Sequence, residues 1–255
     1  MAEEQNKVET LEQGNVYFFY RPRVEQEDPE DIEDVQNMYM VLSPHGRDRY
    51  RLAIIGRKHL PDPGAKQERI WGFVDMVEKD PKKVVGALGE EEYETKTRGK
   101  RHRPAARPAG EGIYRIVRHD DHTHLVYARE LPERTGEVQE ELEIEDEANY
   151  VISVKNPDKP SPEGAGLPED REAEYPERLQ ERFGDRRFID ADPPDLLDYE
   201  GSQFVLISAA RDVKEDLGIE LNPQDEDESR AEIFSDLRLE KSKQPIEPLL
   251  EGEWE

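Results

Sequence analysis

The sequence predicts an α+β fold, built predominantly of antiparallel β-sheet with a few short helices. Apolar and aromatic residues gather in short runs, turn-forming residues separate the runs, and the helical patterns are brief. Apolar residues make up only 34 % of the chain and charged residues 38 %. Because the apolar residues form runs instead of being scattered, we expect a folded core beneath an unusually charged surface.

Eight segments have the alternation or continuous apolar character of strands. They are Val16–Tyr20, Met38–Leu42, Tyr50–Ile55, Ile70–Val77, Ile113–Arg118, His122–Tyr127, Tyr150–Val154 and Gln203–Ser208. In the first segment both alternating sets of side chains are aromatic or apolar, so this strand is expected to be covered on both faces. Turn-forming residues at Ser43–Gly46 predict a hairpin between the second and third segments.

Helical signals are short and capped. Asp80 is suited to be an N-cap, Pro81 fits the first helical position, and Gly89 ends the pattern. Further short helices are expected over Pro176–Phe183, Asp212–Leu217 and Glu228–Leu237. Residues 94–110 lack a hydrophobic pattern and are expected to form a long loop.

Composition shifts divide the chain into four regions. Residues 1–13 are expected to form a flexible N-terminal arm, and 14–155 a β-rich core with a subdomain break near 80–110 as an open alternative. The Pro- and Gly-rich segment 156–175 is a linker-like loop, and 176–255 is a C-terminal α+β region that packs on the core.

The net charge of −26 constrains solvent and partners. An acid-rich surface in which arginine replaces lysine, as in 47–51 and 98–107, is typical of halophilic adaptation. At 1 M salt the Debye length falls to about 3 Å and screens the self-repulsion. An anionic body disfavours nucleic acid and membranes as partners.

With no cysteine, there is no disulfide or thiolate chemistry. The acidic N-terminus and the lack of a long apolar run predict a soluble, cytoplasmic protein. The nucleotide-binding, hydrolase-elbow and metalloprotease motifs are missing from the sequence.

A basic segment is the first candidate site. Six cations occur within twelve residues without an acid among them: Lys96, Arg98, Lys100, Arg101, Arg103 and Arg107. Guanidinium groups bind phosphate and carboxylate with matched geometry, so the segment predicts an anion site for a phosphate-bearing ligand or an acidic protein. The alternative is that these cations pair with the protein's own carboxylates.

Three of the six histidines lie in the second candidate, His119 to His124. If Asp120 and Asp121 form a two-residue turn, His119 pairs with His122, and His124 lies on the same face. Together with Asp121, the imidazoles of His119, His122 and His124 are suited to a divalent metal that activates water. The alternative is an exposed polar turn.

The leading interpretation is a non-enzymatic binding protein that uses the basic segment. The alternative is a metal-assisted hydrolase built on the His119–His124 hairpin. Whether the chain is an enzyme, and its oligomeric state, stay open at this stage.

Overall fold

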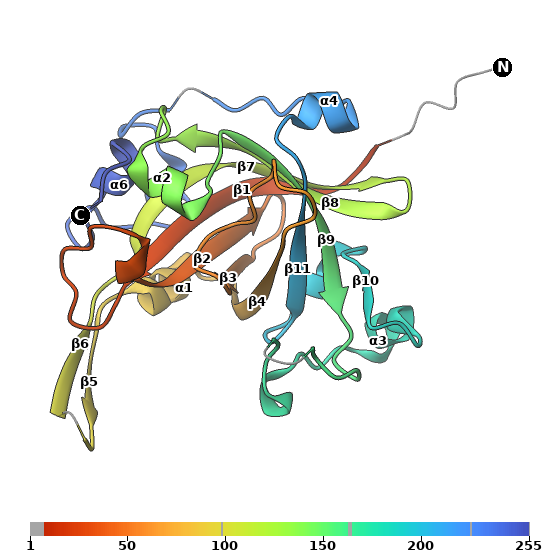
Figure 1. Cartoon of the computed structure of the whole chain (residues 1–255), viewed down its shortest axis with the longest axis horizontal. Coiled ribbons are helices and arrows are strands. Elements are labelled where there is room, and N and C mark those ends of the chain that lie inside the picture. Colours follow the sequence, from red (N-terminus) through yellow and green to blue (C-terminus); the bar gives the residue numbers. More distant parts are fainter. Residues whose placement is uncertain (1–7, 98, 163–164, 225, 255) are drawn as a thin grey trace.

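The computed structural model describes residues 8–97, 99–162, 165–224 and 226–254, and its main feature is a closed antiparallel barrel of eight strands (Figure 1). Around the barrel the order is β1-β2-β3-β4-β11-β9-β8-β7, and β7 pairs again with β1. The strands are β1 (Glu9–Pro22), β2 (Val35–Pro44), β3 (Tyr50–Ile55), β4 (Arg69–Glu78), β7 (Arg107–His119), β8 (His122–Leu131), β9 (Glu147–Lys155) and β11 (Gln203–Ala210). A short strand, β10 (Phe188–Asp190), pairs with the end of β9. The prediction of a mainly antiparallel sheet is thus confirmed. The sequence did not predict that this sheet closes into a barrel.

Short helices lie around the barrel. They are α1 (Pro81–Leu88), α2 (Glu137–Leu142), α3 (Glu177–Phe183), α4 (Val213–Leu217), α5 (Glu232–Ser235) and α6 (Glu247–Leu250), with 3-10 turns η1 (Ile32–Asp34), η2 (Glu169–Arg171) and η3 (Pro194–Leu197). The Asp80 carboxylate accepts the N–H of Lys82, as the capping signal predicts. None of the helices in the described part of the chain has the length and apolar composition needed to cross a bilayer.

The barrel is filled with side chains and is also covered outside. Phe18 and Tyr20 belong to the core cluster that fills it, while Tyr17 and Phe19 belong to a second cluster, and all four are fully buried. The second cluster includes residues of α1 and of the C-terminal segment 231–250. This confirms the prediction that the first strand is covered on both faces.

One end of the barrel is closed by α2 and the loops beside it. Val138, Leu142 and Ile144 are fully buried in the main core together with Leu60. Leu60 N–H donates to the carbonyl of Leu142, so the loop after β3 is joined to the loop before β9. Backbone hydrogen bonding thus brings together two loops that are distant in sequence.

Three expectations from the sequence were wrong in detail. The loop expected over 94–110 contains most of a hairpin, β5 (Glu91–Thr95) and β6 (Gly99–Arg103), because opposite charges such as Glu91 and Arg103 face each other across it. β1 begins at Glu9 instead of at Val16, since the first part of the strand pairs with β7. The helix expected over Glu228–Leu237 is reduced to α5, where the Glu111 carboxylate accepts the N–H groups of Glu232 and Ile233.

Candidate functional site

The β5–β6 hairpin extends away from the barrel as a separate two-stranded arm (Figure 1). We call residues 91–103 the arm. Arg101 pairs with Glu25 at 3.2 Å, and Arg103 pairs with Glu91. Two of its cations are therefore engaged with the protein's own acids, as the alternative interpretation of this segment predicted.

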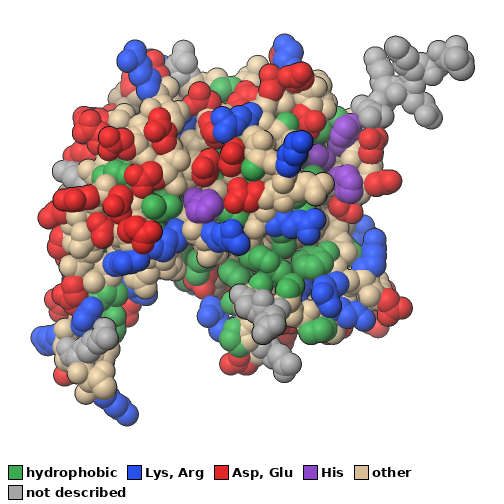
Figure 2. Space-filling model, in the orientation of Figure 1, with side chains coloured by type: hydrophobic (Ala, Val, Ile, Leu, Met, Phe, Trp, Pro, Cys, Tyr) green, Lys and Arg blue, Asp and Glu red, His purple; other side chains and the backbone are tan. Residues whose placement is uncertain are grey.

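The remaining basic residues of the segment differ from one another. Arg107 is buried, and its guanidinium donates to the carbonyl of Glu27. Lys96 and Lys100 are exposed and form no ion pair with any described residue. Arg98 lies outside the described residues. Figure 2 shows Lys and Arg side chains on the arm, whereas acidic side chains dominate the upper part of the visible face.

His102 lies on β6 and links the arm to the loop that follows β1. Its Nδ1 is 2.6 Å from Glu27 Oε1, and its Nε2 is 3.4 Å from Glu90 Oε2. The hydrogen bond to Glu27 raises the pKa of His102, with smaller contributions from the charges of both glutamates. Protonation of His102 therefore strengthens its interaction with Glu27, which joins the arm to the loop after β1.

Arg21 anchors the base of the arm, a role that the sequence reasoning missed. It is 1 % exposed and donates to the carbonyls of Ala87 at 2.9 Å and Gly89 at 3.0 Å. It also donates to the carbonyl of Pro104, directly after β6. One guanidinium thus holds the end of α1 and both ends of the arm. The only signal in the sequence is an arginine that ends an aromatic run.

The histidine hairpin has the predicted register. His119 pairs with His122, and Val117 pairs with His124, so Asp120 and Asp121 form the two-residue turn. The rings of His119 and His124 lie 6.0 Å apart between centroids. Burial lowers the pKa of His124, whose Nδ1 lies 2.8 Å from Asn149 Oδ1.

The hairpin tip itself is open. The His122 side chain is 65 % exposed, with Nδ1 3.9 Å from Asp190, and Asp121 is also exposed. Among the described residues, the ligand atoms of His119, His122 and His124 do not come within 4.8 Å of one another. The metal-assisted hydrolase therefore stays a prediction of the sequence that no contact in the structure favours.

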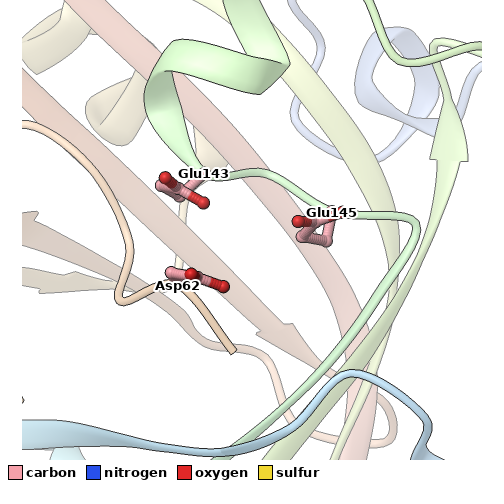
Figure 3. A group of neighbouring side chains, drawn as sticks. All are labelled: Asp62, Glu143 and Glu145. Carbon is pink, nitrogen blue, oxygen red and sulfur yellow. The ribbon is translucent and has the colours of Figure 1, made fainter. Parts of the chain in front are cut away.

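A different group of acids does converge, and the sequence gave no signal for it. Asp62, Glu143 and Glu145 place one carboxylate oxygen each within 4.8 Å of the others (Figure 3). They come from the two loops that the Leu60–Leu142 hydrogen bond joins. Carboxylate oxygens are the ligands that Ca²⁺ and Mg²⁺ prefer.

A cation of the protein already contacts this acidic group. Arg211 Nη2 lies 2.9 Å from Asp62 and 3.2 Å from Glu145. The hydrogen bond from Arg211 lowers the pKa of Asp62, while burial, and then repulsion by Asp62 and Glu145, raise that of Glu143. Because Arg211 supplies the positive charge, the three carboxylates alone do not identify a metal site.

Another carboxylate is buried outside the barrel. Glu111 is 1 % exposed and accepts the N–H groups of Glu232 and Ile233, at 3.0 Å each. Burial first, and then a hydrogen bond with Glu226, raise its pKa to about 9. Burial together with the charges of Glu226 and Glu232 raises the pKa of Glu130 to about 7. This acidic group secures the C-terminal segment to β7 and β8.

Comparisons of this chain with protein-family models, with curated proteins and with solved structures found no match.

Proposed function

We propose that this chain is a non-enzymatic binding protein that holds an acidic or phosphate-bearing partner with its arm. The observation that carries the proposal is the placement of Lys96 and Lys100. Both are exposed on a hairpin that extends away from the barrel, and neither forms an ion pair with a described residue.

The rest of the molecule supports this interpretation. Side chains fill the barrel, so its interior serves as a core and not as a ligand chamber. Arg21 fixes the base of the arm, which reduces the conformational entropy that binding would cost. In a chain of net charge −26, an exposed basic projection favours an anionic partner over the protein's own surface.

A pull-down from native lysate at the cell's own salt concentration tests the proposal. The arm variant is Lys96→Ala/Lys100→Ala, and the control is Lys66→Ala/Lys79→Ala, which removes two exposed lysines of the barrel and changes the net charge equally. We expect the wild type and the control to retain the same partner near stoichiometrically and the arm variant to lose it. A partner retained equally by all three proteins would contradict the proposal, as would the recovery of none.

A further inference from the structure

A groove of about 790 Å³ lies at the base of the arm, between α1 and residues 238–244. Lys82 and Glu90 line it on the side of α1, and Arg238, Glu240 and Lys243 line it on the side of the C-terminal segment. Gly86 of α1 also lines it, and a Cβ added there would meet nothing within 4 Å. The backbone of α1 is therefore open to an occupant of the groove.

Some charged side chains that line this groove form ion pairs, and others do not. Glu240 pairs with Lys243 at 2.9 Å, and Glu90 lies 3.4 Å from His102. Lys82 and Arg238, by contrast, form no ion pair within the described part of the chain. Glu90 shares His102 with Glu27, so it is only partly compensated. The lining still carries three cations, Lys82, Arg238 and Lys243, against two acids, in a protein that is otherwise strongly acidic.

A buried amide also lines the groove. Gln244 is 6 % exposed, and its Oε1 accepts no hydrogen bond from the described residues. An unsatisfied buried polar group destabilises the folded state. The wall of the groove thus contains a buried acceptor without a partner, and its lining contains two cations without an ion pair to a described residue.

We propose that this groove binds an extended acidic peptide segment of the partner that the arm holds. Carboxylates of the peptide pair with Lys82 and Arg238, and a peptide N–H donates to Gln244 after a small adjustment of its side chain. This inference rests on the proposed function and names the chemistry of the partner. A peptide fits better than a phosphate monoester because Gln244 Oε1 lacks a donor, which a peptide N–H supplies and a fully ionised phosphate monoester does not.

Fluorescence anisotropy with a labelled peptide of eight glutamates tests the groove directly. The titrations use the lowest KCl concentration at which circular dichroism shows the full chain folded. We expect Lys82→Ala/Arg238→Ala to weaken binding about tenfold or more, since both ion pairs with the peptide are removed. The Lys66→Ala/Lys79→Ala control should bind within about twofold of the wild type.

Gln244→Leu separates the hydrogen bond from the charges. It should weaken binding of the glutamate peptide about threefold to tenfold while leaving the net charge unchanged. A matched peptide of eight glutamines should bind none of the proteins measurably. Thermal melts of each variant show whether a loss of binding accompanies a loss of folding.

The outcomes distinguish this inference from the proposed function. If the wild type and the Lys82→Ala/Arg238→Ala variant bind the peptide with equal affinity, the proposal that the groove binds an acidic peptide is wrong. The proposed function of the arm is then still tested separately by the pull-down. Failure of the wild type to bind the glutamate peptide also overturns the groove. If tripolyphosphate binds in its place and is lost in the groove variant, the peptide assignment is wrong. If the peptide binds at the groove but the arm variant retains the partner in the pull-down, the groove proposal is supported and the proposed function of the arm is contradicted.

Discussion

Two buried glutamates on neighbouring strands are neutralised in different ways. Glu12 of β1 is enclosed at one end of the barrel, where Arg51 Nη2 donates to it at 2.9 Å and the Tyr114 hydroxyl at 2.8 Å. Arg51 is 1 % exposed and also pairs with Asp198 at 2.7 Å. The charge on Glu12 is therefore balanced by an opposite charge held in place by hydrogen bonds.

Glu111 of β7 has no such counter-charge among the residues that the structure describes. Its neighbours are two backbone N–H groups and the carboxyl group of Glu226, and burial favours its protonated form. Both carboxyl groups are buried, but Glu12 lies against an arginine, whereas burial raises the pKa of Glu111. The comparison shows that the partner, and not burial alone, decides how a buried acid responds to pH and salt.

The largest effect is expected from removing the counter-charge of Glu12. Arg51→Met leaves the buried Glu12 largely uncompensated, with only the partly exposed Arg47 3.8 Å away, which should lower the free energy of unfolding by about 3–5 kcal/mol. Urea denaturation at pH 7 and fixed KCl measures it. Adding Glu12→Gln to the variant should recover part of the loss, because the uncompensated charge is gone. A loss below about 1 kcal/mol would mean that this network behaves like an exposed ion pair.

The next effect concerns pH. The pKa of Glu111 rises from 4.5 in the unfolded chain to about 9 in the folded one, so its contribution to stability is fully present below pH 4.5 and is lost as pH rises toward 9. In that window the wild type should lose up to about 1.4 kcal/mol of stability per pH unit relative to Glu111→Gln, which mimics the protonated carboxyl.

Urea denaturation of both proteins at pH 5 to 9 measures this difference. Glu33→Gln is the control, because the Glu33 side chain is 84 % exposed. Its free energy of unfolding should have the same pH dependence as that of the wild type. If the stability of Glu111→Gln shows the same pH dependence as that of the wild type, Glu111 is ionised in the folded protein. The contrast with Glu12 then disappears.

The smallest effect is expected at an exposed ion pair. Arg118 is 42 % exposed and pairs with Asp192 and, at 2.8 Å, with Glu9. Arg118→Gln should cost less than about 1 kcal/mol in 0.1 M KCl, and almost nothing in 2 M KCl, because salt screens exposed charges. The loss caused by Arg51→Met should persist at both salt concentrations. Equal salt dependence of the two variants would contradict the distinction between buried and exposed pairs.

Local sequence was sufficient for the presence of the eight barrel strands, the α1 helix and the turn of the histidine hairpin. Each depends on residues within a few positions: alternation in Tyr50–Ile55, the cap at Asp80, and the two-residue turn at Asp120 and Asp121. The arm was missed because oppositely charged residues face each other across it, with Arg103 paired to Glu91 and Lys100 opposite Glu94 without an ion pair, and such residues give no hydrophobic alternation.

Tertiary structure alone decided how these elements close and what they bring together. The pairing of β8 with β9 closes the barrel, and no local pattern encodes that pairing. Closure then places Asp62 beside Glu143, Glu111 beside residues of the C-terminal segment, and Lys82 across a groove from Arg238. The sequence by itself therefore determined the eight barrel strands, the capped helix α1 and the charge excess, because periodicity and capping are local and composition sets the charge. The groove and the buried acids follow from contacts between residues that are distant along the chain.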